Sequence, residues 1–257
     1  MPKQERRLPK HVLSVDEAER ILDLPDVGDP YGLRDRAILE TLYSTGIRRL
    51  ETIGLAVYDL DAERGTLRIR QGKGGKDRTV PIGERAVSWI HKYIQEARPK
   101  LVMPPDTGTL FLTQEGEPMS PSRLTEIARD YIAKANLGKT GACHLFRHTC
   151  ATLMLEGGAD IRFVQEMLGH VQLTTTQIYT LVSIRQLKAV HSMTHPSARL
   201  DKSHRSSATV PALTTVPQAE DLLARLDAER EEEDAENARP PSPARSSGDA
   251  KDGTLAP

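Results

Sequence analysis

Tyr179 and His170 lie nine residues apart in the stretch LGHVQLTTTQIYT, residues 168–180. A tyrosine hydroxyl has an ordinary pKa of about 10, so it acts as a nucleophile only beside a base or in a positive field. If it attacks a phosphodiester, charge builds on the nonbridging oxygens, and the planar fork of arginine suits these oxygens best. The leaving sugar oxygen then needs a proton donor. This chemistry requires two arginines, a lysine or histidine acid and a helper histidine; a metal is not needed if the arginines and the lysine carry the charge.

The chain contains candidates for each of these roles. HLFRH places His144 and Arg147 three residues apart, on one face at the start of a predicted helix. Lys73 lies in the glycine-rich turn QGKGGKD, from which its side chain can reach a substrate. Arg48 follows Thr-Gly-Ile at a predicted helix N-terminus, where backbone N–H groups also favour an anion.

Taken singly, the basic candidates have commoner structural explanations. Arg48 has a neighbour in Arg49, and an arginine at a helix start is usually a solvated charge. Lys73 alone would usually be a surface lysine in a turn, and Lys76 in the same turn is its rival.

The same holds for the histidines. His144 alone is more often a capping or core residue, and His170 could interact with the dipole of the helix that ends before it. His148, next to Arg147, is expected to be structural. The two cysteines, Cys143 and Cys150, fit no common zinc spacing, so we expect small core residues and a reducing compartment.

These side chains need a scaffold, and the hydrophobic pattern predicts a mainly α-helical α+β domain with a small antiparallel β-hairpin. Ser14 and Glu17 form a capping box, and Ser120-Pro121 opens another helix. The alternating stretches 65–70 and 78–82 predict the hairpin. The other predicted helices are 33–43, a short one from about 49, 84–97, 120–136, 144–156, 160–168 and 183–193.

The charge is unevenly distributed along the 257 residues. Residues 1–196 hold 27 basic and 24 acidic side chains, while residues 197–257 hold 8 and 12, so an acidic tail masks a mildly basic body. We expect 1–11 to be a basic lead-in, 12–196 a folded body and 197–257 a largely disordered tail with a marginal helix at 219–233 and a solvated charge run. No run of about 18 apolar residues predicts a membrane span.

Four segments together resemble the signature boxes of the tyrosine recombinases, the phage-integrase and Xer-type family. They occur in the family's order over roughly 12–195, and they read YSTGIRRLETIGL, RQGKGGKDRTVPIG, HLFRHTCATLMLEGGADIRFVQEMLGH and TTTQIYT. An HxxR pair alone is common by chance, whereas four boxes in order are specific. The resemblance implies that 12–196 is a tyrosine recombinase catalytic domain with the family's fold.

The resemblance also implies a role for each matching residue. Tyr179 would attack a DNA phosphate and form a 3′-phosphotyrosyl link, while Arg48 and Arg147 bind the nonbridging oxygens. Lys73 would protonate the leaving 5′-oxygen. The histidines assist: His144 would help proton transfer at the tyrosine, and His170 would hydrogen-bond the phosphate. Glu51 matches an acidic position that orients the first arginine. No cofactor, metal or ATP is implied, since the bond energy is kept in the phosphotyrosine.

The expected partners are double-stranded DNA and other recombinase protomers, in a homo- or hetero-tetramer on paired sites in the prokaryotic cytoplasm, at the nucleoid. The family usually has a separate N-terminal DNA-binding domain that closes a clamp, and we expect it to be absent here because the resemblance starts within about a dozen residues. Three alternatives stay open: a type IB topoisomerase, a non-catalytic DNA-binding remnant, and, weakest, a metal site of His144, His148 and His170.

Overall fold

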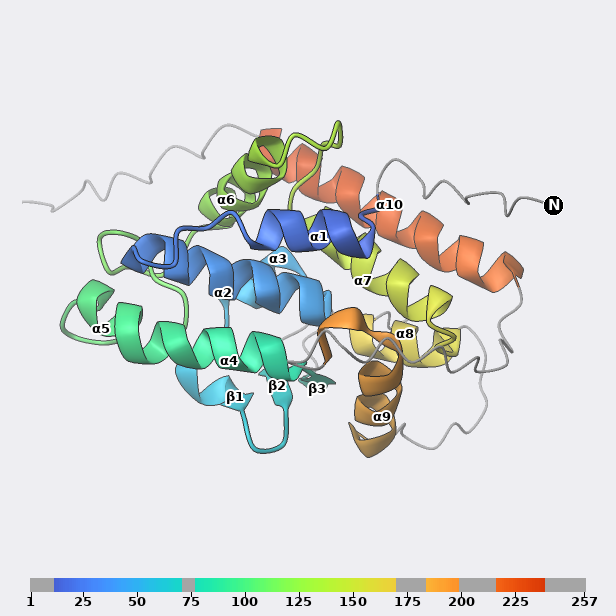
Figure 1. Cartoon of the computed structure of the whole chain (residues 1–257), viewed down its shortest axis with the longest axis horizontal. Coiled ribbons are helices and arrows are strands. Elements are labelled where there is room, and N and C mark those ends of the chain that lie inside the picture. Colours follow the sequence, from blue (N-terminus) through green and yellow to red (C-terminus); the bar gives the residue numbers. More distant parts are fainter. Residues whose placement is uncertain (1–11, 71–76, 170–183, 199–215, 239–257) are drawn as a thin grey trace, which may run out of the picture.

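The computed structural model describes residues 12–70, 77–169, 184–198 and 216–238 (Figure 1). It is mainly α-helical with one small antiparallel sheet, as the sequence predicts. No helix in these ranges combines the length and the apolar character needed to cross a bilayer.

Helix α2 (Pro30–Thr45) is the centre of the fold, and α1 (Val15–Leu22), α4 (Glu84–Lys92) and α7 (Cys143–Glu156) pack around it. The Asp29 side chain caps the start of α2 by accepting from two backbone N–H groups. Pro30 has no backbone N–H, so the first position of the helix leaves no donor without an acceptor. Gly46 ends the helix in the left-handed region, at φ 59°. The helix is buried on all sides, which explains why its apolar residues do not form a single stripe.

The sheet contains the predicted hairpin and one further strand. Strand β2 (Thr66–Ile69) pairs antiparallel with β3 (Arg78–Pro81), with Leu67 opposite Val80, and β1 (Leu60–Asp61) adds to the other side of β2. The sequence did not predict β1, because two residues are too few to show an alternation. The hairpin tip, 71–76, lies outside the described residues.

The other predicted helices are present with small shifts of their ends. The helix expected at 84–97 is α4, continued by a π-helical turn, η2 (Tyr93–Ala97), and by α5 (Arg98–Leu101). The remaining elements are α3 (Arg49–Ile53), η1 (Val57–Asp59), α6 (Pro121–Lys134), α8 (Ile161–Leu168), α9 (Ile184–Thr194), η3 (Pro196–Ala198) and α10 (Val216–Ala238). The capping box at Ser14 and the Ser120 cap form as predicted.

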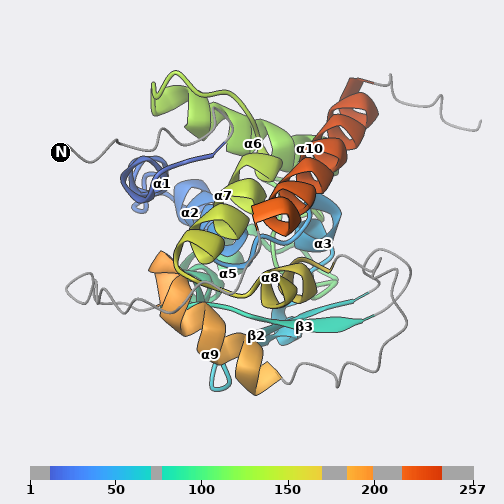
Figure 2. The same cartoon turned by 90° about the vertical axis from the view of Figure 1, so that its right-hand side faces the viewer.

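Helix α10 differs from the expectation for the tail. The predicted marginal helix is real, but it is longer and it crosses the body against α7 and α8 instead of extending into solvent (Figure 2). Leu222 and Leu226 are fully buried there, in a second apolar cluster with side chains of α7 and α8. The prediction that this charge run is simply solvated is therefore wrong for α10. The division of the chain at residues 11 and 196 stays a prediction.

Candidate active site

Arg48 lies at the N-terminal end of the short helix α3, where the chain leaves the left-handed turn at Gly46. Its guanidinium Nη1 is 3.3 Å from a carboxylate oxygen of Glu51, and its backbone N–H donates to the other oxygen at 2.9 Å. The neighbouring Arg49 points the other way and donates to Thr125 of α6. The helix start thus directs the two adjacent arginines to opposite sides.

Glu51 is held from a second side by Arg78, the first residue of β3. The two guanidinium nitrogens of Arg78 donate to the two carboxylate oxygens of Glu51 at 2.6 and 2.8 Å. Burial alone would raise the pKa of Glu51, but the bonds from Arg78 and Arg48 outweigh it and lower this pKa to about 2. Glu51 therefore stays charged and fixes two guanidinium groups side by side.

Arg78 was not among the site residues predicted from the sequence. The sequence does show that Arg78 is a basic residue within the box RQGKGGKDRTVPIG and that it begins a predicted strand. What the sequence could not show is that this end of β3 lies beside α3, because 27 positions separate Arg78 from Glu51.

Arg147 lies in the first turns of α7 and is almost completely buried. It donates to the backbone carbonyl of Gly46 at 2.7 Å and to that of Leu168 at 3.1 Å. Burial lowers the pKa of this guanidinium to about 10; the nearby Arg48 adds to the lowering, and the carboxylate of Glu229 opposes it. These contacts to the C-terminal ends of α2 and α8 hold Arg147 in place, and it shares Glu229 with Arg48.

One carboxylate joins the two arginines, and it comes from α10. Glu229 accepts from Arg48 Nη2 through Oε1 at 2.7 Å and from Arg147 Nε through Oε2 at 3.0 Å. Burial would lower the pKa of Arg48, but Glu229 and Glu51 outweigh it and raise this pKa. An oxyanion with two oxygens thus fits between these guanidinium groups.

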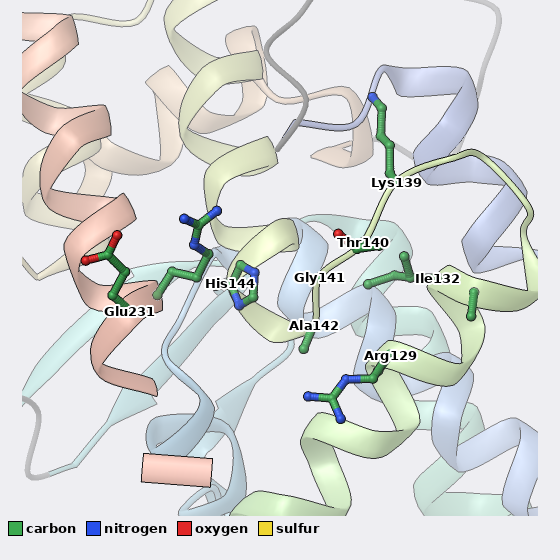
Figure 3. Close-up of a pocket in the computed structure, with 10 residues that line it drawn as sticks. Arg129, Ile132, Lys139, Thr140, Gly141, Ala142, His144 and Glu231 are labelled. Carbon is green, nitrogen blue, oxygen red and sulfur yellow. The ribbon is translucent and has the colours of Figure 1, made fainter. Parts of the chain in front are cut away.

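His144 lies on the same first turn of α7 and faces a cavity of about 510 Å³ (Figure 3). Arg129 of α6 and Lys139 line the cavity from one side, and α10 closes the other side with Arg230 and Glu231. Of the ten lining residues, three are basic and one is acidic, and the Lys139 ammonium is bound to Glu17. The cavity meets the arginine site through His144, which lies one helical turn before Arg147 on α7.

Three of the predicted site residues, Lys73, His170 and Tyr179, lie outside the described residues. The described chain stops at Gly169, whose carbonyl oxygen is 3.4 Å from Arg48 Nη2, so the position just before His170 is at the arginine pair. The structure thus brings together Arg48, Glu51 and Arg147, with His144 one helical turn before Arg147 on α7.

The remaining histidine and cysteine residues of α7 are structural. His148 is buried, its pKa is lowered by that burial, and its Nε2 lies 3.7 Å from Asp227 of α10. Cys143 and Cys150 are not joined in a disulfide, and both are buried in the core, as predicted. Within the part of the chain that the structure describes, no cluster of His, Cys, Asp and Glu could hold a metal ion.

Comparison with known proteins identifies relatives over most of the chain. A family model described as "Phage integrase family" matches residues 11–185. Tyrosine recombinase XerC 2 of Ralstonia nicotianae is 53% identical over 202 residues, which are 79% of this chain and 58% of that protein. Tyrosine recombinase XerD of Staphylococcus epidermidis is 43% identical over 197 residues, which are 77% of this chain and 66% of that protein. The chain thus spans 58% and 66% of the lengths of these two relatives.

Two solved structures share the fold. XerA recombinase is 35% identical with a TM-score of 0.57, and the match covers 70% of this chain and 64% of that one. XerH site-specific recombinase, solved bound to its difH substrate in a pre-cleavage complex, is 29% identical with a TM-score of 0.56. That match covers 73% of this chain and 55% of XerH.

Proposed function

Because this chain belongs to the phage integrase family, we propose that it carries the catalytic site of a site-specific recombinase, which cuts and rejoins double-stranded DNA. The observation that carries the proposal is the arginine pair. Arg48 and Arg147 bind the two oxygens of one carboxylate, and the two nonbridging oxygens of a phosphodiester have similar geometry and charge. The relatives named as tyrosine recombinases support the same chemistry.

In the proposed reaction the hydroxyl oxygen of Tyr179 attacks the phosphorus, and the bond from phosphorus to the 5′-oxygen breaks. Lys73 gives its proton to that oxygen, while His144 takes part in removing the tyrosine proton. A 3′-phosphotyrosyl bond and a free 5′-hydroxyl result, and the 5′-hydroxyl of a partner strand later attacks the phosphotyrosyl bond and releases the tyrosine. No bond energy is lost in these exchanges, so they need no ATP.

Arg48 and Arg147 would stabilise the charge that develops on the nonbridging oxygens, with His170 as a further donor. Glu51 and Arg78 would act through Arg48, because Glu51 accepts from Nη1 of Arg48, not from the Nη2 that meets Glu229, and Arg78 holds Glu51 in place. The proposed assembly is a homo- or hetero-tetramer of recombinase protomers on paired DNA sites in the cytoplasm, and XerH bound to a DNA substrate supports DNA as the partner.

The test is a covalent-adduct assay with nicked duplexes built from inverted repeats of the source genome. After denaturation, the wild-type chain should carry a DNA strand, and Tyr179→Phe should carry none. Tyr31→Phe is the matched control, since Tyr31 lies in the first turn of α2 while the site lies beyond the other end of that helix, at Gly46, and it should form the adduct normally. DNA binding without any adduct on a genuine site would refute the proposal, and relaxation of supercoiled plasmid without site preference would indicate a topoisomerase.

A further inference from the structure

We propose that α10 occupies the phosphate site of its own chain, so that α10 and duplex DNA exclude each other. Glu229 takes the place of the scissile phosphate, and DNA must displace the helix before Tyr179 can react. The inference rests on the proposed function, because it takes Arg48 and Arg147 as the ligands of the phosphate.

The first support is the geometry at Glu229. Its two oxygens are divided between the two arginines, at 2.7 Å from Arg48 and 3.0 Å from Arg147. A surface carboxylate that merely neutralises an arginine would usually contact one partner and remain exposed. Here the Glu229 side chain keeps 19% of its surface, and those of Arg48 and Arg147 keep 14% and 5%. The contact is therefore inside the site.

The second support is the way α10 is seated. Leu222 and Leu226, one helical turn apart, are buried on the face that meets α7 and α8, and the Asp227 side chain lies beside His148. Glu229 follows Leu226 by three positions, so the same face carries the apolar anchors and the carboxylate. The seat thus determines where Glu229 points.

The third support is the charge of the helix. Residues 216–238 contain nine acidic side chains and two basic ones, Arg225 and Arg230. The Glu229 carboxylate of this acidic helix lies on the arginine pair, and a DNA backbone is a polyanion that would contact the same two guanidinium groups. The charges of the helix and of DNA therefore favour competition for this site.

The helix can leave without opening the main core. Its buried leucines belong to the smaller apolar cluster with α7 and α8, while the large cluster around α2 is formed without residues of α10. Removing Glu229 leaves Arg48 and Arg78 facing Glu51, with Arg147 held by backbone carbonyls. The emptied site would then be strongly positive and open to an external phosphate.

The experiment compares the full-length chain with Glu229→Gln, which keeps the shape of the side chain and removes its charge. The probe is a 30-base-pair duplex of arbitrary sequence, and its affinity is measured by fluorescence anisotropy at fixed salt. We expect binding to tighten by about tenfold, since a closed state that is about 90% populated reduces the apparent affinity by that factor. Glu220→Gln makes the same charge change on an exposed position of α10 and should bind like the wild type.

A second measurement follows the helix itself. Backbone hydrogen exchange of residues 216–238 should become faster when the duplex is added to the wild-type chain, and it should already be fast in Leu226→Asp without DNA. Leu226→Asp should also bind the duplex more tightly, although it leaves Glu229 in place. Unchanged protection of α10 in the DNA complex would overturn the inference, as would equal effects of the two glutamate variants.

Two outcomes separate this inference from the proposed function. An adduct on Tyr179 that forms equally fast in the wild type and in Glu229→Gln, at subsaturating DNA, would overturn the inference and leave the proposed function standing. Tighter binding and a displaced α10 without any adduct would leave the inference standing and contradict the proposed function. Protection of 216–238 that disappears on dilution would overturn the same-chain arrangement, because the helix would then come from a second copy.

Discussion

The ion network around Glu40 and the one around Glu51 and Glu229 both contain buried arginines, and they differ in where their carboxylates come from. In the core ion network, Arg36 and Arg85 both bind Glu40 at 2.9 Å, and Arg85 also binds Glu19 at 2.5 Å. These acids belong to α1 and α2, the first elements of the chain. The carboxylate side chain of Glu40 has no exposed surface.

The site ion network comprises Arg48, Arg78, Arg147, Glu51 and Glu229. Glu51 comes from α3, the helix that Arg48 caps. Glu229 comes from α10 and lies 181 positions after Arg48 in the sequence. The core network is closed by the elements that form the core, whereas the site network is completed by a helix that packs outside it. The difference indicates that the first network stabilises the fold and the second holds a position for an exchangeable anion.

The largest effect is expected when the core network is broken. Glu40→Ala would leave Arg36 and Arg85 buried beside an empty position, and removing one partner of a buried pair costs about 3–5 kcal/mol. Urea denaturation should show this loss in the free energy of unfolding. Glu229→Ala, which removes a carboxylate from the other network, should cost less than half as much; equal losses would contradict the comparison.

The next effect is on chemistry rather than on stability. Arg147→Lys keeps a charge but loses the planar fork that meets Glu229 and two carbonyls, so adduct formation should slow by about 10²–10³-fold. The free energy of unfolding should fall by only about 1 kcal/mol, because lysine keeps the positive charge that faces Glu229 and can still donate to one of the carbonyls. Single-turnover adduct kinetics and urea denaturation measure the two quantities, and a stability loss as large as that of Glu40→Ala would refute the distinction.

Acid should weaken the site network through Glu51. Its pKa is about 2 in the folded chain and 4.5 in the unfolded one, so its contribution is fully present above pH 4.5 and is lost as the pH falls toward 2. The shift corresponds to roughly 3 kcal/mol. Urea denaturation at pH 7 and pH 3 should show a smaller pH dependence for Glu51→Gln than for the wild type. Glu63→Gln, at an exposed position, is the control and should leave the pH dependence unchanged.

The smallest effect concerns the glycine beside the site. Gly169 has φ 72°, and a Cβ there would lie 2.8 Å from the guanidinium carbon of Arg78. Gly169→Ala should therefore cost more than the roughly 1–2 kcal/mol of a left-handed alanine, because Arg78 must also move. Gly138→Ala gives the control, since Gly138 has φ 66° and open space around it. Equal losses of unfolding free energy would show that Arg78 yields freely.

Much of the fold follows from local sequence. The capping box at Ser14 and the proline start at Ser120-Pro121 involve residues within four positions of one another, so their pattern is sufficient to predict them. The hairpin follows from alternation on both sides of a glycine-rich turn. Strand β1 was not predicted, because two residues are too few to show an alternation. The π-helical turn η2 was not predicted, because its residue pattern does not differ from that of an α-helix.

The sequence by itself determined the family, the order of its four boxes and the candidate residues, since these depend on residue types and spacings along the chain. Only the tertiary structure decided that Arg48 and not Arg49 faces Arg147, that Arg78 holds Glu51, and that Glu229 lies across the arginine pair. The reason is physical: ion pairs between segments 27 to 181 positions apart depend on how helices and strands pack, and no local pattern records that packing.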